Sequence, residues 1–140
     1  MANYLLDTTA FSALVKEHPL AKARLAALEA THRVVICTVV RGEVLYGLEL
    51  MAHGRRKLDL ERKINDLLAI LPCAPIPEEA ANHYAHIKRR TERRGSRLDE
   101  NDLWIAATSL SLGAILVTAD SDFQRVNGLQ LEDWVEDNSR

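Results

Sequence analysis

Short apolar runs alternate with longer segments of helical spacing along most of this chain of 140 residues. Each run has the length of a strand, is rich in Val, Ile or Leu, and precedes a helical segment. This alternation is typical of α/β folds, in which helices cover both faces of a mostly parallel sheet. We therefore expect an α/β three-layer sandwich with a mostly parallel central sheet. The expected strands are 3–7, 33–37 and 114–118, with an edge strand near 130–134.

Start and stop signals delimit the helices expected around these strands. Pro19 suits the first turn of a helix, Thr38 suits an N-cap, and Gly95 suits the residue that follows a helix end. The prolines within 71–76 make that extended segment a poor central strand. The expected helices are two between 9 and 30, one after Thr38 that breaks at 53–56, then 59–70, 77–94, 99–112 and a short one near 122–125.

Length and composition indicate a single domain spanning 1–140, with 47% hydrophobic and 27% charged residues. No apolar run approaches the ~20 residues that cross a membrane, and the first residues lack a signal-peptide pattern. Cys37 and Cys73 form no Cys-x-x-Cys pair. We therefore expect buried free thiols and a cytoplasmic location, a disulfide between the two cysteines being the alternative.

The formal net charge of −2 conceals a basic stretch at 86–97, which holds six of the 18 lysines and arginines. If acids clustered elsewhere are neutralised by a metal ion, the remaining surface is more basic than the total suggests. That balance favours a polyanionic substrate. The alternative interpretation of the basic stretch is a solvated helix face.

Four carboxylates occupy positions that such a fold would bring to one point. One ends the first strand, one lies early in the helix after the second strand, one opens the helix before the third strand, and one follows that strand. Ligands of open α/β sheets bind outside the carboxyl ends of the strands. Clustered acids repel one another, so a divalent metal ion is the simplest explanation for them. In chain order the four acids are Asp7, Glu43, Asp102 and Asp120.

Each acid also has a structural alternative. Asp7 could cap the helix that follows it. Glu43 lies in an otherwise apolar helix, where an unpaired carboxylate is costly, so it needs either Arg41 or a metal as partner. Asp99 and Asp102 have the spacing of a capping box; we assign the cap to Asp99 and the metal to Asp102.

The helix carrying Glu43 is apolar nearly all round, so one of its sides is a candidate surface for contact with another chain.

The last acid has two candidates, Asp120 and Asp122. Asp120 lies nearer the strand end and is our choice, whereas we expect Asp122 to cap the short helix or to support the site from outside. Oxygen ligands without histidine or cysteine suit Mg²⁺ or Mn²⁺ rather than zinc. The chain contains no Gly-x-Ser-x-Gly elbow, Gly-x-Gly-x-x-Gly turn or Walker phosphate loop.

Four stretches around these acids resemble the PIN-domain ribonucleases, and within them the VapC-like toxins of type II toxin–antitoxin pairs. They are Tyr-Leu-Leu-Asp-Thr-Thr at 4–9, Val-Val-Arg-Gly-Glu-Val-Leu-Tyr-Gly at 39–47, Asn-Asp-Leu-Trp-Ile-Ala-Ala at 101–107 and Leu-Val-Thr-Ala-Asp-Ser-Asp-Phe at 116–123. The resemblance spans nearly the whole chain and implies a PIN-like sandwich. It places Asp7, Glu43, Asp102 and Asp120 in the acidic site, with Thr118 and Asp122 beside it.

The resemblance further implies RNA cleavage that depends on Mg²⁺ or Mn²⁺, restraint by a cognate antitoxin, and a homodimer. The chemistry agrees, because a carboxylate-held metal lowers the pKa of a bound water and aligns the hydroxide with a phosphodiester. Basic side chains could hold the RNA backbone without choosing its sequence. The candidates for that contact are Lys88, Arg89, Arg93 and Arg97.

Two alternative functions remain at this point. A haloacid-dehalogenase-type phosphatase would also place an acid after the first strand, as Asp7 is. Most such phosphatases carry a second acid two positions later, where this chain has Thr9. The other alternative is a catalytically silent binding module that docks through the apolar helix of Glu43.

Overall fold

In the computed structural model, which describes residues 2–136, five strands form one sheet in the order β3-β2-β1-β4-β5. Every neighbouring pair is parallel, and Leu5 of β1 lies opposite both Val35 of β2 and Leu116 of β4. Parallel strands have their carboxyl ends on the same side of a sheet, so the residues that follow β1 and β4 meet there. The strands are β1 Asn3–Leu6, β2 Arg33–Cys37, β3 Cys73–Ala74, β4 Ile115–Val117 and β5 Leu131–Glu132.

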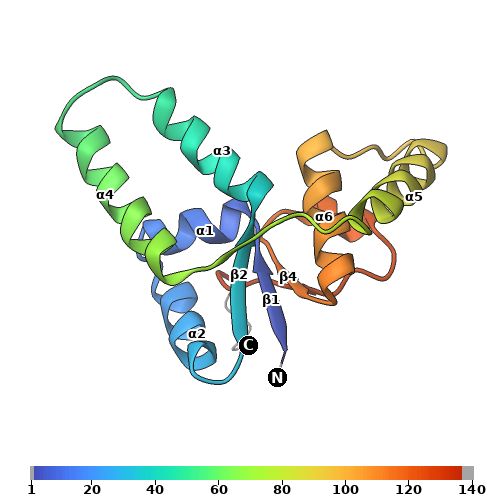
Figure 1. Ribbon diagram of the computed structural model, residues 1–140, viewed down its shortest axis with the longest axis horizontal. Coiled ribbons are helices and arrows are strands. Elements are labelled where there is room, and N and C mark those ends of the chain that lie inside the picture. The colour runs from blue at the N-terminus through green and yellow to red at the C-terminus, as the bar shows by residue number, and fades with distance from the viewer. Residues whose placement is uncertain (1, 137–140) are drawn as a thin grey trace.

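Six α-helices within these residues flank the sheet, which confirms the expected α/β class. Figure 1 shows α1 to α4 on one side of the strands and α5 and α6 on the other, so the three-layer arrangement is also confirmed. The helices are α1 Thr8–Val15, α2 Pro19–Glu29, α3 Thr38–Glu49, α4 Arg55–Ile70, α5 Ala80–Arg93 and α6 Glu100–Leu112, followed by the 3₁₀ helix η1 Ser121–Arg125.

The core is centred on the middle strands because helices cover both faces of the sheet. Leu5 and Leu6 of β1, Ile36 of β2 and Leu116 of β4 are fully buried. A strand that is covered on both faces is apolar throughout, whereas a half-covered strand alternates apolar and polar residues. These strands follow the first pattern. Burial of each such side chain stabilises the fold by about 1.5–3 kcal/mol. The ends of β1 and β4, which the acids follow, are therefore held in place by a well-packed core.

Two helix starts differ from those expected, each for a local reason. Thr38 is the first residue of α3 rather than its N-cap, because β2 runs directly into the helix. Cys37 takes the cap position and makes no side-chain capping hydrogen bond. α4 begins at Arg55, earlier than the expected residue 59, because Gly54 turns the chain there with a φ of 152°.

The end of α5 follows the expected pattern, whereas its start does not. Gly95 has a φ of 69°, a left-handed conformation that favours glycine, and the Ser96 N–H donates back to the carbonyl of Thr91. At the other end, the Ala80 N–H donates to the Pro77 carbonyl in a separate turn. The helix therefore begins at Ala80 rather than at residue 77.

Both cysteines are free, as expected, but only Cys37 is buried. Cys73 is exposed because it lies in β3, a two-residue strand at the edge of the sheet. The prediction that both thiols are buried is therefore wrong for Cys73. Within residues 2–136, none of the helices combines the length and apolar character needed to span a membrane.

Candidate active site

The structure brings the four expected carboxylates to the same end of the sheet. Asp7 directly follows β1, and Asp120 follows β4. Glu43 lies in the second turn of α3, and Asp102 lies in the first turn of α6. Burial raises the pKa of both Asp7 and Asp102, and the charge of Asp120 raises each of them further. The four acids therefore share one electrostatic environment, as the fold class predicts.

Asp7 is the most constrained of these acids, with only 3% of its surface exposed. Its Oδ1 accepts hydrogen bonds from the Ala10 N–H (2.9 Å) and the Thr9 hydroxyl (2.7 Å). Its Oδ2 accepts a hydrogen bond from the Thr118 hydroxyl. Burial raises the pKa of Asp7, and these hydrogen bonds oppose the rise. Asp7 is thus the N-cap of α1, and the charge of Asp120 also raises its pKa.

Two threonine hydroxyls join the loop after β1 to the loop after β4. The Thr118 hydroxyl accepts the Asp120 N–H at 2.9 Å while donating to Asp7. The Thr9 hydroxyl accepts the Ala119 N–H at 3.0 Å while also donating to Asp7. Thr118 is among the residues expected beside the site, whereas Thr9 is not. In the sequence, the only sign of this role for Thr9 is that it lies two residues after Asp7.

Asp120 and Asp122 differ clearly in their surroundings. Asp120 faces the cluster, because its charge adds to the effect of burial in raising the pKa of Asp102. Its Oδ1 also accepts the Asp122 N–H at 2.9 Å, which makes Asp120 the N-cap of η1. Asp122 instead forms an ion pair with Arg125 at 3.1 Å. Of the two roles expected for Asp122, the cap of the short helix is wrong, because Asp120 takes that position two residues earlier, whereas support of the site from outside stays a prediction.

Glu43 is half-buried and is held by neighbours that the sequence analysis did not single out. Its Oε1 accepts the Thr8 hydroxyl at 2.5 Å, and its Oε2 accepts the Asn101 side-chain amide at 3.4 Å. Arg41, the partner considered from sequence, is exposed and makes no ion pair in the described part of the chain, residues 2–136. Thr8 and Asn101 each adjoin one of the expected acids, Asp7 and Asp102. Through them, Glu43 is tied to α1 and α6.

Asp102 carries the clearest sign of crowded negative charge. Its pKa is raised to about 6, first by burial and then by the charges of Asp120, Asp99, Glu43 and Asp7. Asp99 occupies the N-cap position of α6, as expected, but makes no side-chain capping hydrogen bond. Asp99 therefore occupies the expected cap position without forming the capping hydrogen bond. Its negative charge instead repels the carboxylate of Asp102.

The donor set suits a hard divalent cation. Every candidate ligand is a carboxylate oxygen, with the hydroxyls of Thr8 and Thr118 beside them, and Mg²⁺ and Mn²⁺ prefer such oxygens. Among residues 2–136, no three His, Cys, Asp or Glu side chains are close enough together to hold an ion as they stand. The raised pKa of Asp102 nevertheless shows that added positive charge would be favourable here.

The family model described as the PIN domain matches residues 4–129 of this chain. The chain belongs to the PIN-domain family. This PIN domain is similar to Ribonuclease VapC1 of Haemophilus influenzae (strain R2866), with 31% identity over 134 residues that cover 94% of this chain and 97% of the relative. It is also similar to the tRNA(fMet)-specific endonuclease VapC of Salmonella typhimurium, with 27% identity over 135 residues that cover 96% and 99%.

Solved structures of toxin–antitoxin proteins share the fold of this PIN domain. VapBC2 from Rickettsia felis, bound to a DNA fragment from its promoter, superposes with a TM-score of 0.86 at 26% identity, covering 94% of this chain and 98% of that one. VapBC-1 from nontypeable Haemophilus influenzae gives a TM-score of 0.84 at 29% identity, covering 96% and 99%. The resemblance to VapC-like ribonucleases is thereby confirmed.

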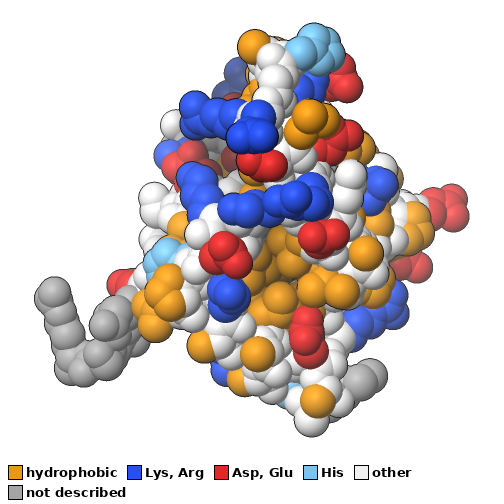
Figure 2. Space-filling model, turned by 90° about the vertical axis from the view of Figure 1, so that its left-hand side faces the viewer, with side chains coloured by type: hydrophobic (Ala, Val, Ile, Leu, Met, Phe, Trp, Pro, Cys, Tyr) orange, Lys and Arg blue, Asp and Glu red, His pale blue; other side chains and the backbone are white. Residues whose placement is uncertain are grey.

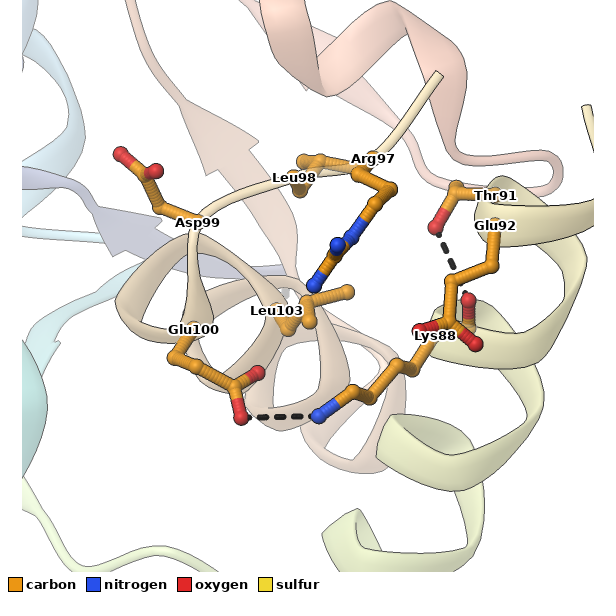
Figure 3. Close-up of a pocket in the computed structure, with 8 residues that line it drawn as sticks. All are labelled: Lys88, Thr91, Glu92, Arg97, Leu98, Asp99, Glu100 and Leu103. Atoms are coloured by element: carbon orange, nitrogen blue, oxygen red, sulfur yellow. Dashed lines mark hydrogen bonds and ion pairs between the residues drawn. The ribbon is translucent and has the colours of Figure 1, made fainter. Parts of the chain in front are cut away.

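A hollow of about 320 Å³ lies between α5 and the start of α6 of this PIN domain, and Asp99 and Glu100 are among the residues that line it. Figure 3 shows the Arg97 side chain pointing into it, opposite Lys88 and Glu92. Lys88 donates to Glu100 at 2.9 Å and to the Tyr84 hydroxyl at 3.0 Å, so its charge is partly compensated. Of the four basic residues expected to contact RNA, Lys88 and Arg97 border this hollow, whereas Arg89 and Arg93 are exposed on α5.

The other side of the PIN domain is apolar at its surface. Figure 2 looks onto the side of the molecule that carries α2 to α4 and shows hydrophobic side chains gathered there, bordered by lysines and arginines. An apolar groove between α1, α3 and α4 begins beside Glu43. Leu45 and Tyr46 of α3 are exposed, and contact of this side with another chain stays a prediction. The exposed hydrophobic side chains on α3 and α4 include Leu45, Tyr46, Leu50 and Leu58.

Proposed function

We propose that this chain, acting as one PIN-like domain, is a metal-dependent endoribonuclease and the toxin of a toxin–antitoxin pair. Its relatives are named as VapC ribonucleases, and its four acids lie at the same end of the sheet. The observation that carries the proposal is the clustering of acids around Asp102, whose pKa is raised to about 6. Groups with strongly perturbed pKa values gather at functional sites, where their environment serves the chemistry.

Asp7, Glu43, Asp102 and Asp120 would hold Mg²⁺ or Mn²⁺. When bound, such an ion lowers the pKa of a coordinated water and stabilises negative charge on the phosphate. The protein's part is to hold the carboxylates in place. The Thr118 and Thr9 hydroxyls fix Asp7, the η1 turn fixes Asp120, and Thr8 fixes Glu43.

We assign supporting roles to Thr118 and Asp122. Thr118 orients Asp7 and the backbone of Asp120 with one hydroxyl. Asp122 donates its N–H to Asp120 and holds Arg125, so it steadies the turn without facing the acids. Water rather than the ribose 2′-OH would attack the phosphodiester, which leaves a 5′-phosphate and a 3′-OH.

A cognate antitoxin and a second copy of this chain are the proposed protein partners, and the cytoplasm is the proposed location. The relatives of known structure are VapBC proteins. Exposed apolar patches are typical of interfaces. The uncovered side chains Tyr46, Leu50 and Leu58 are therefore the surface available for these contacts.

The phosphatase alternative has little support. The residue two positions after Asp7 is Thr9, which donates to Asp7 rather than serving as a second acid. The silent binding module is separated from the nuclease by experiment.

RNA cleavage by purified protein tests the proposal. We expect cleavage with Mn²⁺ or Mg²⁺, none with a chelator, and none in Asp7→Asn or Asp102→Asn, both of which keep side-chain size. The products should carry a 5′-phosphate. Full activity in either variant would refute the assignment, and a wild-type protein that neither cleaves RNA nor binds Mn²⁺ by calorimetry would favour the silent module.

A further inference from the structure

Two arginines of α5 converge on one amide that follows η1. Arg90 and Arg94 lie four residues apart and so share a face of the helix. Both meet the side chain of Asn127. With its oxygen turned toward these donors, the amide accepts hydrogen bonds from Arg90 at 2.8 Å and from Arg94 at 2.9 Å. That orientation is the one consistent with donors on both sides.

This arrangement keeps two positive charges close together without neutralising them. Within the residues that the structure describes, 2–136, neither Arg90 nor Arg94 forms an ion pair with a carboxylate. Asparagine holds their guanidinium groups with a neutral oxygen, whereas aspartate at the same position would have given two ion pairs. A purely structural link between α5 and the loop would be stronger with the carboxylate. The amide therefore leaves the pair free to attract an anion.

The arginine pair is connected to the acidic site through η1. Asp120 accepts the Asp122 N–H at 2.9 Å, and Asp122 pairs with Arg125 at 3.1 Å. Arg125 also donates to the Arg97 carbonyl at 3.0 Å, just before α6 begins. Asn127 lies two residues beyond Arg125. The arginine pair is therefore linked to Asp120 through the segment that carries η1.

We propose that Arg90, Arg94 and Asn127 form a phosphate site that anchors the RNA backbone away from the cleaved bond. The proposal rests on the proposed ribonuclease function and adds residues outside the set expected from sequence. Guanidinium groups bind phosphate oxygens through paired hydrogen bonds, and such contacts add affinity without reading bases. The hollow beside Arg97 (Figure 3) is a separate feature, since none of these three residues lines it.

Asn127→Asp is the sharpest test, because it keeps both arginines and gives them a carboxylate to pair with. Binding is measured by fluorescence anisotropy, with a labelled single-stranded RNA in EDTA, so that no metal or cleavage is needed. We expect binding to weaken by about tenfold, as for the removal of one charge-assisted hydrogen bond. The slope of log affinity against log salt should become shallower by about 0.7 if one phosphate is no longer bound, or by about 1.4 for two phosphates. The Tm should stay the same or rise.

Matched variants on α4 supply the controls. Asn65→Asp makes the same change at an exposed position, and Arg55→Gln combined with Arg56→Gln controls for Arg90→Gln combined with Arg94→Gln. Neither control should alter RNA binding by more than its small effect on net charge. The proposal is overturned if Asn127→Asp matches Asn65→Asp in affinity and salt slope, or if the weakening occurs only with duplex DNA. A wild type that binds RNA but never cleaves it would defeat the proposed function and leave this binding result interpretable.

Discussion

At the scale of single residues, Asp102 links the stability of the fold to the proposed activity. Its folded-state pKa of about 6 exceeds the ordinary value of 3.8, chiefly because of burial and then because of the neighbouring acids. Such a group contributes stability below about pH 4, and this contribution is lost as pH rises toward its folded pKa. At neutral pH the ionised side chain therefore destabilises the folded protein. At the proposed metal site, a bound cation would offset this loss of stability by neutralising the negative charge.

Asp102→Asn should accordingly stabilise the protein while abolishing RNA cleavage. In chelator at pH 7.5, we expect the free energy of unfolding to rise by about 1–2 kcal/mol, a range discounted because Asp102 is partly solvated. The gain should shrink toward pH 4, where the carboxyl is protonated in the folded state and roughly half protonated in the unfolded state. Urea unfolding at the two pH values measures it. A variant less stable than wild type at pH 7.5 would contradict the assigned repulsion.

Thr118 is expected to matter through its two hydrogen bonds. Thr118→Val would leave a buried Asp7 oxygen and the Asp120 N–H without their partner. We expect a loss of about 1–3 kcal/mol in the free energy of unfolding and a lower rate of RNA cleavage. Thr118→Ser keeps the hydroxyl and should retain most of both. Equal behaviour of the valine and serine variants would show that the hydroxyl has no such role.

At the scale of elements, two glycines in helical surroundings should respond to alanine with opposite signs. Gly113 ends α6 in a left-handed conformation with a φ of 60°, so alanine there should destabilise the fold by about 1–2 kcal/mol. Gly42 lies inside α3 with open space around it, so alanine there should stabilise the fold by about 0.5–1 kcal/mol. Denaturant unfolding compares the two variants. Shifts of the same sign would contradict these backbone assignments.

The order of the elements and the four acids could be predicted from sequence, because apolar runs and their spacing carry that information. Element starts are harder to predict, as the early beginning of α4 at Arg55 shows, since it depends on the backbone of a single glycine. The partners of the acids were not predictable. Thr8 and Glu43 are 35 residues apart and Thr9 and Ala119 are 110 apart, so only the folded topology pairs them.

At the scale of the whole molecule, the acids, the basic surface of α5 and the apolar surface of α3 and α4 divide the protein by chemistry. The acids lie at the carboxyl ends of the strands, and the arginines of α5 lie on one side of them. Exposed leucines such as Leu45 and Leu58 lie on the other helical layer, where Figure 1 places α3 and α4. Under the proposed function, this separation would leave one face for RNA and another for a protein partner.

Leu50→Asp should therefore weaken protein association and leave catalysis intact. Leu50 is 68% exposed, so the fold loses little. At an interface, such a change should raise the dissociation constant roughly thirtyfold, or about 2 kcal/mol. Leu20→Asp on α2, also at an exposed leucine, is the matched control. Sedimentation of the protein alone and titration with the antitoxin measure both; unchanged association in both assays would exclude this surface as an interface.

Diffraction from crystals soaked in manganese shows whether the four carboxylates form a single metal site. We predict an anomalous peak bounded by carboxylate oxygens of Asp7, Glu43, Asp102 and Asp120, and its disappearance in Asp102→Asn. A well-ordered crystal with no peak at this end of the sheet, or with the ion bound elsewhere, would contradict the metal site on which the proposed activity depends.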